Sequence, residues 1–516
     1  MRVAAADAPE RVLDIGYPQA LACRVMARSR TPLAAIVLAA GKGTRMKSRT
    51  AKVLHELGGK PLAWYPVKRA LDAGASPVVV VVGHQAEAVE AALVASLPGA
   101  PLRFAVQESQ HGTAHAVLAA RRALRGHDGP VAILSGDTPL LETETLLSVV
   151  RARARARAPL AFATMTLAAP RGYGRVLRDA SGRPQRVVEE KDATAAERTV
   201  QEVNAGLYCA DAGFLWKGLA RIGSENAQEE FYLTDLVAEA ARKDGAVAVS
   251  VAPEEASGVN DREELARAGK VLLRRRARAL MRAGVTIEDP ERFDCDEGVE
   301  IEPDVVVEPG ARLLGRTRIG AGCRIGAGAI LRDAVLAPEV TVRPYTLVEE
   351  ASVGRRAVLG PFARLRPGSD IGEEAHVGNF VETKKAVLGR GAKANHLAYL
   401  GDAFVGAGAN VGAGTITCNY DGEKKHPTRI GAGAFVGSDS ILVAPIEIGD
   451  GAYVAAGSVI TEPVPPGALA LGRARQITKE GWVDRRRAEK QMKGAGEKRP
   501  APGAPGQGRA PAKQAG

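Results

Sequence analysis

From residue 301 the sequence follows a six-residue period, and this period restricts the possible fold more than any other feature of the chain. The aliphatic residues that carry the period form three runs: Ile301, Val307, Leu313, Ile319, Ile325 and Leu331; Leu347, Val353, Leu359, Leu365, Ile371 and Val377; and Ile430, Val436, Leu442, Ile448, Val454 and Ile460. An amphipathic α-helix has a period of 3.6 residues and cannot hold this pattern. Each six-residue unit instead makes one side of a triangular coil, with its aliphatic residue pointing into a stacked core. The segment therefore predicts a parallel β-helix of about nine coils.

Two segments, residues 378–404 and 414–429, interrupt the period. Both contain histidine, lysine, asparagine and tyrosine. Repeat proteins commonly place their insertions on one face, which is often the binding face. We expect both segments to interrupt the coils and to carry function.

The part before the repeat alternates short apolar runs with helix-like segments. The runs that read as buried strands are Ala34–Ala40, Pro77–Val82, Leu102–Gln107, Val131–Leu134 and Leu160–Thr166. This alternation predicts an α/β domain of Rossmann-like type with a mostly parallel sheet, which binds ligands at the carboxyl ends of its strands. A charged segment rich in Leu and Ala, from Arg262 to about Arg282, predicts a linking helix.

The predicted organisation has five parts: a leader over residues 1–31, an α/β domain over 32–261, a linker over 262–284, a β-helix over 285–478 and a tail over 479–516. A chain of 516 residues exceeds the roughly 250–300 residues that one hydrophobic core supports, so at least two domains are expected. The 58 glycines and the 4% aromatic content suit the many tight turns of a repeat architecture. We expect the leader to be disordered and unrelated to the fold, and Met26 is an alternative start.

Composition also restricts the compartment and the partners. The five cysteines lie far apart and show no metal-ligand spacing, and no segment approaches the roughly 20 apolar residues of a membrane span. We therefore expect a cytoplasmic protein with free thiols. The net charge of +11 includes +6 from a tail rich in Pro, Gly and Ala, which predicts a disordered, solubilising tail. A nucleic-acid partner is not expected.

A glycine-rich turn, LAAGKGTRM (38–46), follows the first predicted strand. Such a turn lets backbone N–H groups approach a phosphate, and Arg45 and Lys52 can supply cations. The turn matches neither standard phosphate-binding motif, because Met46 stands where a third glycine would be, so alone it is a weak signal.

Several further segments occur in a defined order over the α/β domain: KVLH (52–55), QHGTAHA (110–116), SGDTPL (135–140), GYGRV (172–176), VVEEKDAT (187–194), EVNAG (202–206), NAQEEFYLTD (226–235) and GVND (258–261). With the glycine-rich turn, they resemble sugar-1-phosphate nucleotidylyltransferases. Over nearly its whole length the chain is similar to the bacterial family of bifunctional N-acetylglucosamine-1-phosphate uridyltransferases and glucosamine-1-phosphate acetyltransferases.

The resemblance implies a two-step synthesis of UDP-N-acetylglucosamine, which supplies peptidoglycan and lipopolysaccharide precursors. Acetyl-CoA would acetylate glucosamine-1-phosphate, and UTP would then react with the product and release pyrophosphate. It also implies a left-handed β-helix, a Mg²⁺ requirement and a homotrimer with acetyl-CoA between neighbouring copies.

By resemblance, the α/β domain carries the uridyltransferase site. Arg45 and Lys52 would neutralise the phosphates, and Asp137 and Asn260 would hold Mg²⁺ with hard oxygen ligands. Residues implied to bind UTP or the UDP-sugar are Leu38, Ala39, Ala40, Gly41, Lys52, Gln107, Gly112, Thr113, Gly174, Glu189, Asn204 and Asn260. Within that set, Gln107, Gly112 and Thr113 would contact the uracil, and Gly174, Glu189 and Asn204 the sugar. Capping of a turn by Asp137 or of a helix by Asn260 is the simpler alternative for each.

The chain departs from the family pattern at a few positions, where Ala51, Ala114, Ser135 and Ala205 replace proline, glycine, tyrosine and threonine. None of these changes removes a charge, so altered nucleotide affinity with retained activity is expected.

The interrupted part of the β-helix would hold the acetyltransferase site. Only the free amine of glucosamine-1-phosphate can attack a thioester, and histidine is the natural base near neutral pH. By resemblance His396 fills that role, whereas His376 and His426 are expected to be structural. The substrate-binding residues implied are Arg366, Lys384, Tyr399, Asn410, Asn419 and Tyr420, and those for acetyl-CoA are Ala413, Ser438, Ala456 and Arg473. The Ala413 N–H would stabilise the oxyanion, and Ala398 replaces a common threonine.

Two other functions compete with the bifunctional enzyme. The β-helix could be only a trimerisation rod attached to a uridyltransferase, or the whole chain could be a non-catalytic binding subunit. Arg45, Lys52 and Asp137 together oppose the binding subunit, and the segment around His396 opposes the rod.

Overall fold

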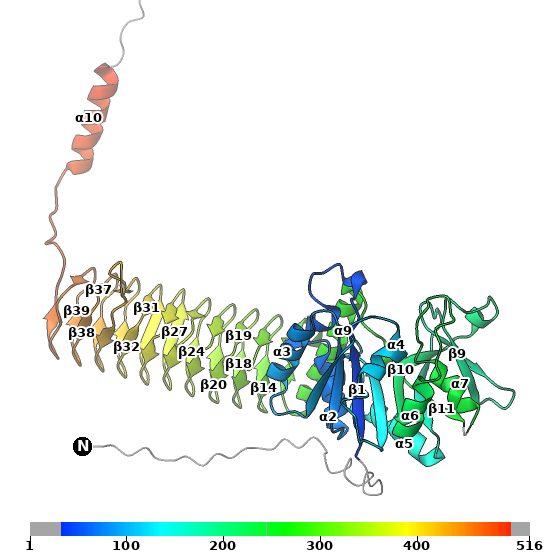
Figure 1. The fold of residues 1–516 in the computed structure, drawn as a ribbon. Helices are drawn as coiled ribbons and strands as arrows, with labels where there is room; N and C mark the ends of the chain where they lie inside the picture. Colours follow the sequence, from blue (N-terminus) through cyan, green and yellow to red (C-terminus); the bar gives the residue numbers. More distant parts are fainter. Residues whose placement is uncertain (1–31, 244, 497–516) are drawn as a thin grey trace, which may run out of the picture.

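The structure, a computed structural model, describes residues 32–243 and 245–496. The predicted leader and the last 20 residues of the predicted tail lie outside the described residues. A globular α/β domain is joined at one end to a long rod of stacked strands, and a separate helix extends beyond the far end of the rod (Figure 1). No helix of the described part is long and apolar enough to cross a membrane.

The α/β domain is built on a nine-stranded sheet whose central order is β11-β7-β10-β6-β1-β4-β5, with β8 paired to β10 and β9 paired to β8. Its strands are β1 (Ala34–Ala39), β4 (Val78–Val82), β5 (Leu102–Val106), β6 (Pro130–Ser135), β7 (Leu160–Thr166), β8 (Arg175–Arg178), β9 (Pro184–Val188), β10 (Glu202–Asp211) and β11 (Ala246–Ser250). β1 pairs in parallel with β4 and β6, whereas β10 is antiparallel to β6 and β7. The predicted α/β fold with a mostly parallel sheet is confirmed.

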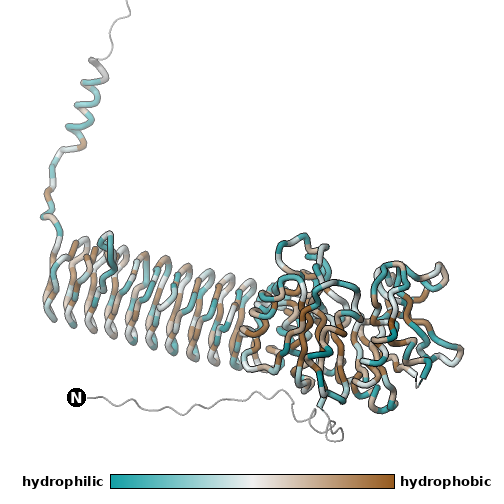
Figure 2. Tube along the Cα trace, viewed as in Figure 1, coloured by the Kyte–Doolittle hydropathy of each residue, from teal (hydrophilic) through white to brown (hydrophobic). Residues whose placement is uncertain are grey.

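The residues on both faces of the sheet are buried, and Figure 2 shows that its strands are apolar. All five residues of β4 are buried valines, and alternate valines join different hydrophobic clusters. Such a run is typical of a parallel strand with both faces packed. The helices are α2 (Trp64–Asp72), α3 (Ala86–Ser96), α4 (Thr113–Ala119), α5 (Thr143–Ala156), α6 (Ala212–Leu219), α7 (Asp235–Ala241), α8 (Pro253–Ala256) and α9 (Arg262–Arg282).

Short elements complete this part of the chain. They are the hairpin strands β2 (Glu56–Leu57) and β3 (Lys60–Pro61) and the 3-10 helices η1 (Thr44–Met46), η2 (Lys52–Leu54), η3 (Glu197–Thr199) and η4 (Pro290–Arg292). The first two 3-10 helices follow β1 and carry Arg45 and Lys52.

The rod consists of three parallel sheets, which we call the first, second and third walls in the order in which each coil visits them. The first wall contains β12 (Thr286–Ile287), β15 (Val306–Val307), β18 (Arg324–Ile325), β21 (Thr341–Val342), β24 (Val358–Leu359), β27 (His376–Asn379), β30 (Lys393–His396), β33 (Asn410–Val411), β36 (Phe435–Val436), β39 (Tyr453–Val454) and β41 (Leu469–Ala470). The second contains β13 (Asp294–Cys295), β16 (Arg312–Leu314), β19 (Ile330–Arg332), β22 (Leu347–Glu349), β25 (Arg364–Leu365), β28 (Glu382–Lys384), β31 (Tyr399–Gly401), β34 (Ile416–Cys418), β37 (Ile441–Val443) and β40 (Val459–Ile460). The third contains β14 (Glu300–Ile301), β17 (Arg318–Ile319), β20 (Val335–Leu336), β23 (Ser352–Val353), β26 (Asp370–Ile371), β29 (Val387–Leu388), β32 (Ala403–Val405), β35 (Thr428–Ile430) and β38 (Ile446–Ile448).

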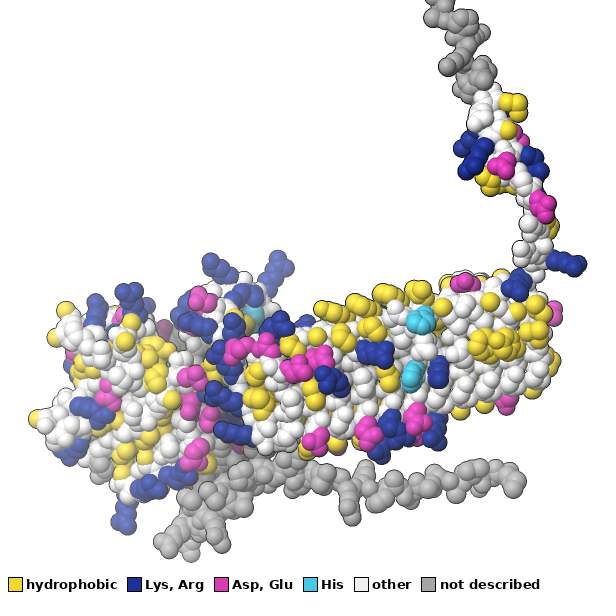
Figure 3. Space-filling view, turned by 180° about the vertical axis from the view of Figure 1, so that it is seen from behind, with side chains coloured by type: hydrophobic (Ala, Val, Ile, Leu, Met, Phe, Trp, Pro, Cys, Tyr) yellow, Lys and Arg dark blue, Asp and Glu magenta, His cyan; other side chains and the backbone are white. Residues whose placement is uncertain are grey.

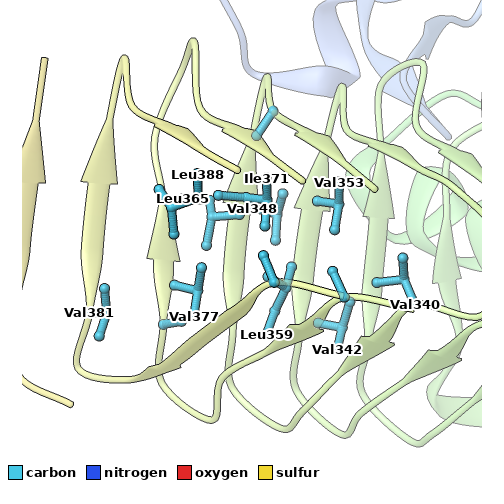
Figure 4. Packing of buried hydrophobic residues seen from close by; sticks show 14 of the residues in the cluster. Val340, Val342, Val348, Val353, Leu359, Leu365, Ile371, Val377, Val381 and Leu388 are labelled. Carbon is cyan, nitrogen blue, oxygen red and sulfur yellow. The ribbon is translucent and has the colours of Figure 1, made fainter. Parts of the chain in front are cut away.

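The core of the rod is formed by inward aliphatic residues of the strands, together with buried residues just before strands, such as Val340 and Val381. Val353, Leu359, Leu365, Ile371 and Val377 are buried and project into the space between the walls (Figure 4). Each strand pairs in parallel with the strand one coil later, so the peptide groups of successive coils hydrogen-bond along the rod. The predicted parallel β-helix is confirmed.

One core position in the predicted register is wrong. Val348 rather than Leu347 is the inward residue, and Leu347 is only half-buried. The cause is one short repeat: the next inward residue, Val353, lies five rather than six residues after Val348. A six-residue step back from Val353 therefore falls on Leu347 instead of Val348.

The prediction that residues 378–404 interrupt the coils is also wrong. They form the ordinary strands from the end of β27 to β32. Their inward positions, Thr383, Leu388, Ala394, Leu400 and Val405, are all buried. Because a threonine and an alanine replace large aliphatic residues, the six-residue period is hidden. The second predicted interruption does contain a loop, residues 419–427, which leaves the rod between β34 and β35.

The helix α9 lies between the two domains and contacts both. The Arg275 guanidinium donates to the Leu140 carbonyl of the α/β domain at 2.7 Å, and that of Arg276 donates to the Val299 carbonyl of the rod. The Asp261 carboxylate caps its first turn by accepting from the Glu264 N–H at 2.8 Å. A direct bond from the Glu297 N–H to the Gly58 carbonyl, at 2.9 Å, joins the rod to the hairpin of the α/β domain.

The described part of the tail, residues 479–496, differs from the prediction of a disordered segment. The structure has a helix, α10 (Trp482–Gly496), and its side chains are exposed as far as Lys493. It extends away from the rod (Figure 1). Arginine, lysine and glutamate are good helix formers, so a local helix can form here without burying an apolar face.

We expect truncation of one inward residue to destabilise the rod. Leu359→Ala removes a fully buried side chain, and a Leu→Ala change in a core typically costs about 2–5 kcal/mol. Val358→Ala, at the half-exposed neighbouring position of β24, is the matched control. Urea unfolding followed by circular dichroism should show a lower midpoint for Leu359→Ala. Equal midpoints for the two variants would contradict the inward assignment of Leu359.

Candidate functional site

The first group of predicted residues lies at the carboxyl edge of β1 and β6, which are neighbours in the sheet. Leu38 and Ala39 end β1, and Ala40 and Gly41 begin the glycine-rich turn that leads to η1. A Cβ added to Gly41 would meet nothing within 4 Å, so the backbone there is open to a ligand. Asp137 follows β6, and this is the edge where parallel sheets bind ligands.

Four polar side chains from three parts of the chain meet at this edge. The Lys52 ammonium forms an ion pair with the Asp137 carboxylate and lies 3.4 Å from Asn260 Oδ1. Arg45 Nη2 donates to the same Asn260 oxygen at 2.8 Å. The Val259 N–H donates to the Asp137 carbonyl at 2.8 Å, which fixes the loop of Asn260 beside the end of β6. The helix-capping alternative for Asn260 is wrong, because Asp261 caps α9.

The arrangement of these oxygens fits a hard divalent cation. Asp137 Oδ2 and Asn260 Oδ1 both lie near the Lys52 ammonium, the latter at 3.4 Å, so the two oxygens lie close to each other. Mg²⁺ is commonly held by one or two protein oxygens, with water and phosphate as the other ligands. Within residues 32–243 and 245–496 no cluster of three or more His, Cys, Asp or Glu has metal-site geometry, so a larger protein-only site is not present there.

The residues predicted to contact uracil also lie together. Gln107 is buried after β5, and its Nε2 lies 3.3 Å from the Gly112 carbonyl and 3.2 Å from His115 Nδ1. Gly112 has φ +101°, and a Cβ there would lie 2.6 Å from the Phe231 carbonyl oxygen. Glycine is therefore required at this position. The Thr113 hydroxyl accepts from the Leu233 N–H at 3.0 Å.

The predicted sugar-contacting residues form a third cluster. The Asn204 N–H donates to the Gly174 carbonyl at 2.9 Å, and the Glu189 carboxylate accepts from the Thr234 hydroxyl at 3.0 Å. Burial raises the pKa of Glu189, and the hydrogen bond from Thr234 only partly opposes it. The sequence analysis missed Thr234 and His115, although both stand inside segments that carry the resemblance.

The replacement of proline by Ala51 has a local structural consequence. The Ala51 N–H donates to Gln85 Oε1 at 2.8 Å, and Gln85 Nε2 donates to the Arg49 carbonyl at 2.8 Å. A proline has no N–H and could not make the first bond. The side chain of Gln85 thus stabilises the turn before Lys52 through hydrogen bonds. A proline would instead restrict the backbone of the turn directly. Ala114 and Ala205 are buried, and Ser135 ends β6.

On the rod, the predicted acetyl-CoA residues follow one edge, the first corner, between the first and second walls. His396 ends β30 at this corner. Backbone bonds from Gly414 N to Leu397 O, from Asp439 N to Ala413 O and from Gly457 N to Ser438 O connect the successive turns. Arg473 Nη1 donates to the Ala456 carbonyl at 2.7 Å. His396, Ala413, Ser438, Ala456 and Arg473 therefore form one line along the rod.

A second group lies at the second corner, between the second and third walls. Arg366 Nη1 pairs with Glu382 at 2.8 Å, Lys384 ends β28, and Asn419 Nδ2 donates to Asp402 at 2.6 Å. Lys425, from the loop 419–427, lies beside Lys384 and lowers its pKa, with a smaller contribution from Arg366. The sequence analysis missed Lys425 because only the return of this loop brings it to Lys384.

The structure does not bring all predicted acetyltransferase residues together in one chain. Tyr399 begins β31, between the two corners, and Tyr420 is exposed on the loop 419–427. Asn410 lies on the first wall, opposite Lys393, and away from the second corner. His396 and Lys384 are separated by the strand β31, whose three residues span roughly 10 Å.

Matches to three protein families agree with this division of the chain. Residues 35–193 match the MobA-like NTP transferase domain, residues 295–388 the GMPPB C-terminal domain, and residues 427–462 the hexapeptide repeat of succinyl-transferase. Fold and family matches together define a nucleotidyltransferase domain joined to a hexapeptide-repeat transferase domain.

Curated relatives extend over nearly the whole chain. The bifunctional protein GlmU of Anaeromyxobacter sp. (strain Fw109-5) is 76% identical over 477 residues, which cover 92% of this chain and 98% of the relative. GlmU of Anaeromyxobacter sp. (strain K) is 73% identical over 469 residues (91% and 96%), and that of Sorangium cellulosum (strain So ce56) is 53% identical over 468 residues (90% and 98%). The chain belongs to the GlmU family of bifunctional proteins, and the predicted family is confirmed.

The raised pKa of Glu189 makes a prediction about stability. Burial disfavours the carboxylate, so the folded state loses stability as the pH rises through the ordinary glutamate pKa toward the raised value. Glu189→Gln removes this penalty. We expect the variant to gain thermal stability relative to the parent as the pH rises above about 4, the ordinary range of a glutamate. Glu225→Gln, at an exposed position, is the control and should show no such trend. A Glu189→Gln difference that is independent of pH would contradict the burial effect.

Proposed function

We propose that this chain makes UDP-N-acetylglucosamine in two steps on two separate sites. The rod would transfer an acetyl group from acetyl-CoA to glucosamine-1-phosphate, and the α/β domain would couple the product to UTP and release pyrophosphate. The observation that carries the proposal is the presence of a cation and oxygen cluster on one domain and a histidine-centred corner on the other, in a chain that belongs to the GlmU family.

For uridylyl transfer, the residues must bring two anionic substrates together. Arg45 and Lys52 would neutralise the UTP and sugar phosphates, and preorganised cations of this kind lower the energy of a phosphoryl transition state. Asp137 and Asn260 would hold Mg²⁺, which when bound supplies Lewis-acid polarisation of phosphoryl oxygens. The open backbone at Gly41 supports approach of the triphosphate to the glycine-rich turn.

Recognition of uracil and sugar would use the two neighbouring clusters. Gln107 has amide groups that can pair with uracil, and the tight contact of Gly112 with the Phe231 carbonyl supports a narrow base pocket. Glu189 and Asn204 would accept or donate hydrogen bonds to the sugar. Glu189 and Asn204 are each held by a hydrogen bond of ordinary length, to Thr234 and to Gly174. This supports binding of the sugar without a large rearrangement of these two residues.

For acetyl transfer, the free amine of glucosamine-1-phosphate would attack the thioester carbonyl carbon, and His396 would take a proton from the nitrogen as the C–N bond forms. The C–S bond then breaks, and the thiolate of CoA leaves. Arg366, Lys384 and Lys425 would bind the sugar phosphate. The lowered pKa of Lys384 supports this role, because two crowded cations gain from an anion placed between them. The Ala413 N–H would stabilise the oxyanion.

A homotrimer would bring the two halves of the acetyltransferase site together. In one chain, the histidine corner and the phosphate-binding corner are separated by β31. An exposed apolar ladder, formed by Tyr345, Phe362, Phe380 and Leu397, runs along the first corner (Figure 3). The rings of Tyr345, Phe362 and Phe380 stack with centroids 5.3 and 5.5 Å apart. All four residues have positive φ, which is uncommon for bulky residues. A second copy of the chain would bury this exposed ladder, and this burial would favour a homotrimer.

We further propose that the enzyme works in the cytoplasm. Cys209, Cys295, Cys323 and Cys418, the cysteines within the described residues, are free thiols, as is usual in a reducing compartment. UTP and acetyl-CoA are the cosubstrates expected there.

Two variants with opposite effects test the two-site proposal. Asp137→Asn should lower uridylyl transfer by about 10²-fold or more, because it removes an anionic metal ligand, and leave acetyl transfer unchanged. His396→Ala should lower acetyl transfer by about 10²–10⁴-fold, because it removes the base, and leave uridylyl transfer unchanged. Pyrophosphate release and free CoA should be measured separately on one preparation of each variant. A His396→Ala enzyme with normal acetyl transfer would overturn the role of His396, and normal uridylyl transfer by Asp137→Asn would overturn the metal site.

A charged residue introduced into the apolar ladder tests whether the ladder forms the interface of the proposed homotrimer. Phe380→Asp should weaken self-association by about 10-fold or more, because it places a carboxylate in a packed interface. Acetyl transfer should fall with assembly, and uridylyl transfer should remain. Val335→Asp introduces the same charge at an exposed apolar position on the third wall and is the control. Analytical ultracentrifugation with both assays provides the comparison, and unchanged association of Phe380→Asp would exclude the ladder as the interface.

A further inference from the structure

His396 has a hydrogen-bond partner on the neighbouring coil, Asn379, which was not among the predicted site residues. His396 Nδ1 lies 2.8 Å from Asn379 Oδ1. The two residues are directly paired in the first wall, because Asn379 ends β27 and His396 ends β30. The imidazole is exposed, whereas Asn379 is half-buried. The ring is therefore held at one nitrogen and free to meet a substrate at the other.

The backbone fixes this pair from both sides. The Asn379 carbonyl accepts from the Leu397 N–H at 3.0 Å, so one residue holds both the side chain of His396 and the turn after it. At the preceding position, a Cβ on Gly378 would lie 1.9 Å from the Asn395 carbonyl oxygen. Only glycine allows the two coils to approach so closely here. The contact between Asn379 and His396 thus follows from the stacking of the coils.

We propose that Asn379 is a positioning residue for acetyl transfer, an inference that rests on the proposed role of His396 as the base. An amide oxygen can only accept, so it requires a proton on Nδ1 and leaves the lone pair on Nε2. The ring then presents Nε2 to the amine of glucosamine-1-phosphate. Because the amide is neutral, it orients the ring without adding a charge beside it.

The charged surroundings of the ring explain why a neutral partner suits this position. Arg343 and His376 line the same cavity of about 260 Å³ as Asn379 and His396. A carboxylate in place of the amide would favour the imidazolium form, which cannot accept the amine proton. Asparagine fixes the tautomer without placing a negative charge beside the ring.

Three variants, assayed for acetyl and uridylyl transfer over a range of pH, test this role. Asn379→Ala should lower kcat for acetyl transfer by about 10- to 100-fold, because the ring loses its orientation. Asn379→Asp keeps the acceptor, so it should retain most activity at high pH. In the plot of its kcat for acetyl transfer against pH, the acidic limb should move to higher pH by about one to three pH units. The reason is that the carboxylate stabilises the imidazolium. His396→Ala serves as the reference for loss of the base.

The outcomes separate this inference from the proposed function. Uridylyl transfer and the oligomeric state should match those of the parent in all three variants, which confirms folding. Normal acetyl transfer by His396→Ala would overturn the base itself. A large loss in His396→Ala with normal kcat in Asn379→Ala would overturn only the positioning role. An Asn379→Asp enzyme that is as inactive as Asn379→Ala at every pH, or that shows no shift of the acidic limb, would also overturn it.

Discussion

The structure of the rod depends on the hydrogen bonds between coils, which require each strand to lie directly on the strand of the previous coil. Each coil adds one parallel strand to each wall, and its inward aliphatic side chain closes the space between the walls. Neighbouring strands lie roughly 4.8 Å apart, so residues one coil apart in sequence come into contact. Any side chain at a corner therefore acquires a neighbour 17 or 18 residues away in the sequence. Both the aromatic ladder and the pair of Asn379 and His396 arise in this way.

This stacking explains how a narrow rod can carry a chemical site. The inner positions are occupied by core residues, so the charged groups gather on the outer faces and at the corners. The first corner collects the histidine and the predicted acetyl-CoA residues, whereas the second collects the cations. The single substantial loop after β34 adds a lysine that the coils alone could not supply. In the α/β domain, the cationic side chains lie together for a different reason. The ends of neighbouring parallel strands lie at one edge of the sheet.

Much of the fold could be predicted from the sequence, because periodicity reports burial directly. The limits were equally physical. The five-residue step between Val348 and Val353 placed Val348 rather than Leu347 inward, and Thr383 and Ala394 concealed a regular coil because they are too small or too polar to mark the core. For the site, motif residues such as Lys52 and Asp137 were identified and do lie together. Gln85, Lys425 and Asn379 could not be found, since each acts through a neighbour that only the folded chain brings near.

The cations of the two sites are held differently before substrate arrives, and this difference bears on how each site would bind phosphate. Lys52 is paired with Asp137 and Arg366 with Glu382, so an incoming phosphate must exchange one anionic partner for another. Such an exchange keeps the side chains ordered. It limits the net gain in binding free energy, because an ion pair within the protein is broken as the ion pair with phosphate forms. Lys384 faces Lys425 instead, and the nearby carboxylate of Asp402 is engaged by Asn419. A phosphate placed between the two lysines relieves repulsion without breaking an ion pair. The strongest attraction for the sugar phosphate on the rod is therefore expected at these lysines, with Arg366 directing the anion rather than providing most of the binding energy.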